Sequence, residues 1–108
     1  MSTSSQVALV GRLGAQVRTK ELPSGDTITA FTVIVDRSAR ERVGPSTRVD
    51  AIACVTSRAR VRSTVERLEP GTLVSVTGTL RRRFWRGGAG RVVGSAMEVV
   101  AQSVHKAS

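Results

Sequence analysis

The apolar residues of this chain alternate at the period of a β-strand along most of its length, and they switch to the period of a helix only once. The switch follows Ser57, after which Val61, Val65 and Leu68 recur on one side of a helix, and it ends at a Pro-Gly pair at residues 70–71. Ser57 is of a type that caps helices, and proline followed by glycine stops them. The sequence therefore predicts one short helix within an otherwise all-β domain.

Five segments carry the strand pattern, three before the predicted helix and two after it. They are residues 6–14, 27–36, 47–56, 72–84 and 91–104. Gly11, inside the first segment, indicates the bulge or bend that a small closed barrel needs. This order is typical of the five-stranded OB barrel, with its helix between strands three and four. Other all-β architectures stay open, because helix placement is only partly determined by a single sequence.

The connections between the predicted strands differ in character. Residues 23–26, Pro-Ser-Gly-Asp, are a strong turn signal, since proline presets φ and glycine accepts a positive φ. Residues 37–46 hold three arginines and a Gly-Pro pair and are predicted to form a basic hairpin loop. Residues 81–91 hold five arginines, the only tryptophan and a glycine-rich run, and they are predicted to form the tip of a β-hairpin.

The charge of the chain points to a polyanionic partner. Seventeen lysines and arginines oppose eight acidic residues, giving a net charge of +9, and all but two of the cations are arginine. Arginine grips phosphate through a planar, bidentate group and also lies flat on bases and rings. An anionic membrane surface fits less well, because no helix with a large apolar face is predicted. A compositional bias toward arginine is the alternative explanation for part of the excess, although it does not account for the scarcity of acids.

Cations and flat rings gathered on one hairpin suit a nucleic-acid strand, because guanidinium groups take phosphates and rings stack on bases. Strand alternation places Arg81 and Arg83 on the face of Trp85, and Arg82 on the face of Phe84. The alternatives are that the tryptophan ring covers the barrel and that the arginines only solubilise a hairpin edge. The predicted nucleic-acid-binding residues are Arg12, Arg37, Arg40, Arg42, Arg48, Arg81, Arg82, Arg83, Phe84, Trp85, Arg86 and Arg91.

The remaining candidates for chemistry do not form a site. Cys54 is the only cysteine, so an internal disulfide is excluded, and its apolar neighbours predict a core position in a reducing cytoplasm. Phe31 is likewise predicted to lie in the core. His105 is expected in a solvated tail, and the glycines at 87–90 lack the Lys-Ser/Thr of a phosphate loop. No enzyme, metal, cofactor or membrane-spanning segment is predicted, and residues 1–108 are expected to form a single domain.

Several stretches in their order resemble the bacterial single-stranded DNA-binding protein (SSB) family. They are VALVGRLG, LPSGDTITAFTVIVDR, VERLEPGTLVSVTGTLRRRFW and RVVGSAMEVVAQSV, which together cover most of the chain. The resemblance implies an OB fold, homotetramers built from dimers, and sequence-independent wrapping of single-stranded DNA. It implies roles in replication, repair and recombination, in the cytoplasm at the nucleoid.

The resemblance also assigns individual positions. Trp85 falls on a stacking tryptophan of the family, whereas Arg48 and Cys54 fall where many members have further aromatic residues. Both substitutions remove stacking rings, although Arg48 can still lie on a base. Family members usually carry a tail with an acidic tip that recruits repair enzymes, and the chain as given stops at Ser108 without one. We expect either a truncated chain or a tail-less paralogue.

Two alternative functions stay open beside DNA protection. One is a tail-less OB-fold adaptor, like the primosomal replication-restart proteins related to SSB, that acts as a dimer through protein partners. The other is RNA binding, since an OB surface that holds the backbone and stacks bases need not read the sugar. The mass of the oligomer distinguishes the adaptor from a DNA-protecting tetramer. Parallel titration with oligo-dT and oligo-U distinguishes RNA binding from DNA binding.

Overall fold

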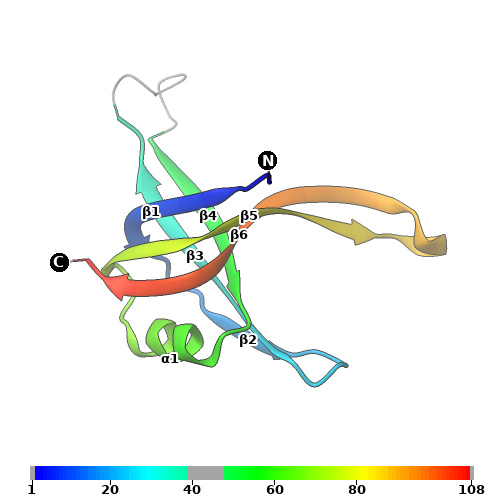
Figure 1. Ribbon diagram of the computed structural model, residues 1–108, viewed down its shortest axis with the longest axis horizontal. Coiled ribbons are helices and arrows are strands. Elements are labelled where there is room, and N and C mark those ends of the chain that lie inside the picture. Colours follow the sequence, from blue (N-terminus) through cyan, green and yellow to red (C-terminus); the bar gives the residue numbers. More distant parts are fainter. Residues whose placement is uncertain (1, 39–47, 108) are drawn as a thin grey trace.

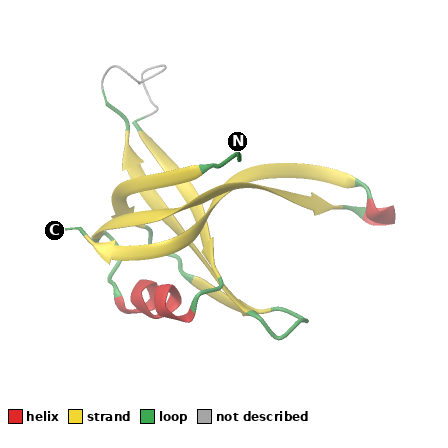
Figure 2. Ribbon diagram, in the orientation of Figure 1, coloured by secondary structure: helices red, strands yellow, loops and turns green. Residues whose placement is uncertain are grey.

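The computed structural model describes residues 2–38 and 48–107. Figures 1 and 2 show strands wrapped into a barrel, with one helix against its lower end and a long two-stranded ribbon projecting to one side. The elements are β1 (Gln6–Leu13), β2 (Arg18–Glu21), β3 (Thr27–Asp36), β4 (Val49–Thr56), α1 (Ala59–Arg67), β5 (Leu73–Arg86), the 3₁₀ turn η1 (Gly88–Gly90) and β6 (Val92–Lys106).

The sheet closes on itself because β1 pairs with two strands. The strand order is β1-β5-β6-β4-β3-β2, and β1 also pairs with β3. Residues Gln6 to Arg12 pair with β5, and Arg12 and Leu13 then pair with Ile34 and Val33 of β3. Five strands thus form a ring, while β2 lies outside it on β3. The helix falls between the third and fourth strands of the ring, so the predicted OB barrel is confirmed.

Gly11 lies where β1 passes from one partner to the other. A Cβ atom at this position would stand 2.5 Å from the carbonyl oxygen of Ile34 and 2.9 Å from a methyl group of Val33. Since backbone cannot yield as a side chain can, only glycine lets β1 approach β3 closely enough to close the ring. The bend predicted from this glycine is where the barrel closes.

The core is built mainly from valine. Inward-facing residues of β3 and β5 such as Val33, Val74 and Val76 are fully buried, and Phe31 is 3% exposed, as predicted. The helix covers one end of the barrel with Val61 and Val65, which are also buried. β-branched side chains suit this packing because they fill a pleated surface with little loss of rotamer freedom.

The predicted helix start was wrong by one residue. The residue that caps α1 is Arg58, which makes no side-chain capping bond, rather than Ser57. Thr56 supplies the hydroxyl instead: the amide of Arg58 donates to its Oγ1 at 3.1 Å. The hydroxyl that holds an amide at this end of the helix therefore belongs to the last residue of β4, one position before the predicted cap.

Strand β2 was also missed. It consists of Arg-Thr-Lys-Glu and all four of its residues are exposed, so no apolar alternation marks it. It forms because the turn at residues 22–26 folds the chain back onto β3, with the amide of Gly25 donating to the carbonyl of Leu22 at 2.8 Å. His105 was predicted in a tail, but it pairs with Ser75 because β6 runs on to Lys106.

Prediction for barrel closure. Gly11→Ala should lower the free energy of unfolding by about 1–3 kcal/mol, because the added methyl group meets backbone atoms of β3. Urea unfolding followed by circular dichroism measures the change. Gly88→Ala is the matched control, since a Cβ there meets no atom within 4 Å, and it should change stability by less than about 0.5 kcal/mol. Equal stabilities of the two variants would contradict the closure argument.

Candidate nucleic-acid interface

The ribbon that projects from the barrel consists of the outer halves of β5 and β6 (Figure 1). Its register is regular from Gly78 to Trp85, so alternate residues share a face. The Trp85 face carries the cross-strand pairs Arg81–Glu98, Arg83–Ala96 and Trp85–Gly94. This is the arrangement of Arg81, Arg83 and Trp85 that strand alternation predicts.

The opposite face of the ribbon carries Arg82, Phe84, Ser95 and Met97. The guanidinium of Arg82 donates to the hydroxyl of Ser95 at 3.1 Å, and Phe84 is 56% exposed. The two aromatic rings therefore point to different sides of the ribbon. A single DNA strand lying along one face can reach only one of them.

Trp85 is 46% exposed, and its indole packs against the strand beside it. A Cβ atom at Gly94 would lie 2.3 Å from Cζ2 of the ring and 2.6 Å from Nε1. The ring therefore occupies the space that a side chain at position 94 would need. Its contact is with the ribbon itself, which leaves part of the ring open to a ligand.

Arg81 is held by a buried carboxylate. Its Nη2 and Nε donate to Oε1 of Glu98 at 2.7 and 3.3 Å. The side chain of Glu98 is 5% exposed and that of Arg81 is 56% exposed, so the guanidinium covers the acid. Burial, with a further contribution from the charge of Glu98, raises the pKa of Cys54 to about 12.

A hollow of about 240 Å³ lies where the Trp85 face meets the barrel. Its floor comes from the paired strands β3 and β4, and Arg18 and Arg83 contribute cations to its lining. Among the described residues, Arg83 makes no ion pair. In OB folds the surface of the second and third barrel strands, together with the loop between strands four and five, binds oligonucleotides. The hollow is lined by Gln16, Arg18, Ala30, Phe31, Thr32, Ala53, Cys54, Val55, Arg83 and Glu98.

The sequence pattern did not point to Arg18 or Glu98 as candidate site residues. Arg18 belongs to the exposed strand β2, whose sequence carries no strand signal. For Glu98 the sequence does hold a signal. It is an acid flanked by Val99 and Met97 in a strand, and it lies opposite Arg81 in the register that the hairpin sets. Burial of such an acid requires a cationic partner.

Two other predicted site residues form bidentate ion pairs with acids. Arg12 donates to both carboxylate oxygens of Asp36 at 2.9 and 3.1 Å, which raises the pKa of the guanidinium. Arg37 donates to both oxygens of Asp50 at 2.6 and 3.0 Å, and this hydrogen bonding lowers the pKa of the carboxyl. Part of the positive charge is therefore matched locally before any ligand binds.

The rest of the predicted site residues are spread over the surface. Arg48 is exposed beside the start of β4, and Arg91 is exposed at the ribbon tip. Arg86 donates to the carbonyl of Gly90 at 2.8 Å, which folds it over the tip. Arg40 and Arg42 lie outside the described residues.

Cys54 is 1% exposed and faces the core, as predicted from its apolar neighbours. The position therefore offers no surface on which a base could stack.

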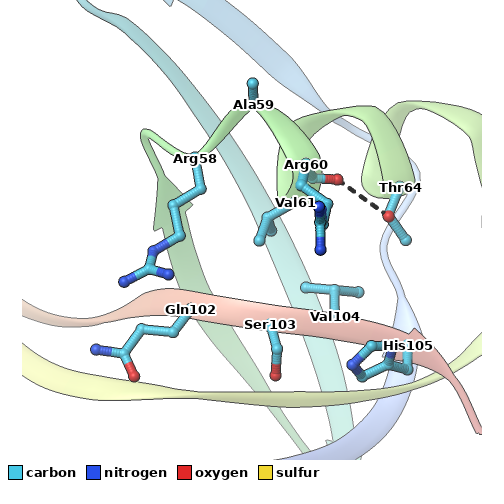
Figure 3. A pocket seen from close by; sticks show the side chains of 9 residues that line it. All are labelled: Arg58, Ala59, Arg60, Val61, Thr64, Gln102, Ser103, Val104 and His105. Carbon is cyan, nitrogen blue, oxygen red and sulfur yellow. Dashed lines mark hydrogen bonds between the residues drawn. The ribbon is translucent and has the colours of Figure 1, made fainter.

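A second hollow, of about 530 Å³, lies between the start of α1 and the end of β6 (Figure 3). Arg58 and Arg60 come from the helix side, and Gln102 and His105 from the strand. The hydroxyl of Thr64 donates to the carbonyl of Arg60 at 3.1 Å. None of these residues belongs to the Trp85 face.

Within residues 2–38 and 48–107, no cluster of potential metal ligands and no helix able to span a membrane is found.

Comparison with known proteins identifies the family. Residues 4–107 match the model of the Single-strand binding protein family. The chain belongs to this family. Single-stranded DNA-binding protein 3 of Listeria innocua serovar 6a is 32% identical over 100 residues, which make up 93% of this chain and 61% of that protein. The single-stranded DNA-binding protein of Bacillus cereus is 33% identical over 100 residues, covering 93% of this chain and 58% of that protein. The chain thus spans about three fifths of the length of these relatives.

The fold also matches that of a solved structure. A solved structure, described as a Plasmodium falciparum SSB complex with ssDNA, matches with a TM-score of 0.74 at 21% identity and covers 93% of this chain and 88% of that one. The resemblance inferred from the sequence is therefore confirmed at the level of family and fold.

Prediction for Cys54. Its thiol should stay protonated and unreactive in the folded protein at about pH 8, because the thiolate is the reactive form and burial raises the pKa to about 12. Absorbance after addition of Ellman's reagent measures the rate. The same protein in concentrated urea, where the pKa returns to about 8.5, is the control and should react completely. Fast reaction of the folded protein would place Cys54 at the surface.

Proposed function

We propose that this chain binds single-stranded DNA without sequence preference and protects it during replication, repair and recombination. The observation that carries the proposal is the Trp85 face, where a half-exposed indole follows Arg81 and Arg83 along one side of a projecting ribbon. Charge neutralisation with ring stacking is the combination by which proteins bind single strands regardless of sequence. Membership in the Single-strand binding protein family supports the same proposal. The role is one of binding, with no catalytic step.

In this proposal the strand lies along the Trp85 face and continues into the hollow at the base of the ribbon. A base stacks on the open side of Trp85, and Arg81, Arg83 and Arg18 contact phosphates. Among the described residues that line the hollow, Glu98 is the only acid, and Arg81 covers it. The path therefore presents cations to the ligand while its one carboxylate is already paired.

The other predicted residues are proposed to extend this surface. They are Arg12, Arg37, Arg40, Arg42, Arg48, Arg82, Phe84, Arg86 and Arg91. Apart from Arg40 and Arg42, which the structure does not describe, they lie on the opposite ribbon face, at the tip, in β1, and beside the ends of β3 and β4, where longer DNA would pass if it wraps around the barrel. The ion pairs of Arg12 and Arg37 should make their contributions smaller than that of Arg83, because a phosphate must compete with a bidentate carboxylate.

We further propose that residues 1–108 act as one DNA-binding domain that assembles into homotetramers in the cytoplasm, at the nucleoid. The names of the bacterial relatives and of the family support the DNA-binding part of this proposal. No described feature favours the adaptor or the RNA-binding alternative. RNA binding becomes an outcome of the titrations below, and the mass of the oligomer in solution tests the adaptor alternative, for which a stable dimer is expected in place of a tetramer.

Prediction for stacking. Trp85→Ala should weaken the binding of labelled oligo-dT by about 1–3 kcal/mol with little change in stability, because it removes one stacking platform from an exposed ribbon. Fluorescence anisotropy of the labelled oligonucleotide measures the affinity. Phe84→Ala is the matched control, since it removes a similarly exposed ring from the opposite face, and it should have the smaller effect. An unchanged affinity for Trp85→Ala would exclude the stacking role, and tighter binding of oligo-U would favour RNA.

Prediction for charge. If about five phosphates are neutralised per subunit, the slope of log affinity against log salt concentration should be about −3.5. Arg83→Ala should make the slope shallower by about 0.7, the contribution of one phosphate contact on a single strand. Titrations at several salt concentrations measure the slope. Arg67→Ala, at the last turn of α1 and away from the ribbon, should leave it unchanged. Equal slopes for the two variants would remove Arg83 from the phosphate path.

A further inference from the structure

Gly94 is an unusual residue for its position. It lies inside β6, where glycine weakens a strand because it has no side chain to pack and loses the most backbone freedom. Among the glycines that the structure describes, Gly25, Gly71 and Gly90 have a positive φ, and Gly94 does not. Its backbone conformation is therefore open to any residue. The reason for glycine must be space rather than backbone geometry.

The space is filled by one side chain. Gly94 is the cross-strand partner of Trp85, and the three atoms nearest to an ideal Cβ at Gly94 are Cζ2, Cε2 and Nε1 of the indole, at 2.3, 2.4 and 2.6 Å. All three belong to the edge of the ring system around Nε1. The ring thus lies over the bare α-carbon, and the smallest side chain, a methyl group, would displace it.

We propose that Gly94 is a positioning residue for DNA binding: its missing side chain lets the indole of Trp85 lie against β6, which covers one side of the ring and presents the other to a base. This inference rests on the proposed function. The 46% exposure of Trp85 agrees with a ring covered on one side only. A ring held in this way has lost its rotamer freedom before the ligand arrives, so stacking costs less entropy.

The residues that directly follow the Trp85–Gly94 pair constrain the position of the ring. The β5–β6 pairing is regular up to Trp85 and Gly94 and shifts by one residue directly after them, where Arg86 pairs with Val92. The extra residue, Val93, is 62% exposed. A bulge of this kind fixes the direction of the neighbouring side chains. Trp85 therefore sits at the last regular position of the ribbon.

A purely structural role is the alternative, because an aromatic residue that covers a strand glycine also stabilises the strand. The two roles differ in what they affect. A structural contact changes the stability of the protein and leaves DNA affinity unchanged while the protein is folded. A positioning contact changes the accessibility of the ring without DNA, and it changes the affinity for DNA.

The experiment compares Gly94→Ala with Gly88→Ala, a matched control on the same hairpin whose added methyl group meets no atom within 4 Å. Trp85 is the only tryptophan, so its fluorescence reports on this ring alone. For Gly94→Ala we expect faster quenching by acrylamide, lower fluorescence anisotropy without DNA, and binding of oligo-dT weakened at least about fivefold, the lower limit for loss of a stacking platform. The control should match the wild type in all three.

The double variant Trp85→Ala/Gly94→Ala separates the two proposals. It should bind no more weakly than Trp85→Ala, since a positioning residue has no effect once its ring is gone. If Trp85→Ala itself leaves binding unchanged, the stacking function fails. If Trp85→Ala weakens binding but Gly94→Ala changes neither quenching nor affinity, the stacking function stands and the positioning role of Gly94 is overturned.

A measurement on the wild type covers the case in which Gly94→Ala does not fold. Nuclear Overhauser contacts between the α-protons of Gly94 and the indole protons of Trp85 should be present without DNA and persist when oligo-dT is bound. Loss of these contacts on binding would show that the ring leaves Gly94 to reach the base, and it would overturn the proposal.

Discussion

The antiparallel pairing of β5 with β6 is the interaction on which the rest of the structure depends. Inside the barrel it runs from Val74–Lys106 to Leu80–Val99 and contributes buried valines to the core. Beyond the barrel the same ladder continues to Arg86–Val92 and forms the ribbon. The register of the ribbon is set in the barrel by the pairs from Gly78–Ala101 to Leu80–Val99, which follow an irregularity between Thr77 and Gly78, because Ala101 and Val99 are buried there and the ladder carries this register outward. The Trp85 face is a direct consequence of that register.

The excess of arginine acquires a more specific meaning in three dimensions. Arg12, Arg37 and Arg81 are matched with Asp36, Asp50 and Glu98, so these three guanidinium groups are locally neutralised and the net charge of +9 resides on other cations. Exposed pairs of this kind add little to stability. Glu98 differs from the other two acids because it is buried, and its loss would leave Arg81 without a defined orientation. The three acids therefore determine which arginines are already engaged in an ion pair when a ligand arrives.

Much of the fold followed from the sequence. The strand at Thr27–Asp36 has the predicted bounds, the single change of period gave the helix, and the core positions of Phe31 and Cys54 were correct. The errors have a common cause. Strand β2 depends on backbone pairing with β3, and the start of the helix has an amide that donates to the Thr56 hydroxyl; neither leaves a mark in the pattern of apolar residues. The sequence predicted a binding site made of arginines and two aromatic rings. It did not predict that Arg18 and Glu98 lie beside them.

The sequence by itself determined the fold class, the cationic character and the alternation that puts Arg81, Arg83 and Trp85 on one face, because these depend on local periodicity and composition. Only the tertiary structure decided which strand closes the barrel, which arginines are paired with acids, and that the Trp85 ring rests on Gly94. Those features depend on the register between distant strands, and register is set by packing across the whole barrel. The sequence predicts an exposed Trp85, and in the folded chain its ring packs against Gly94 of β6 while part of the residue stays open to solvent.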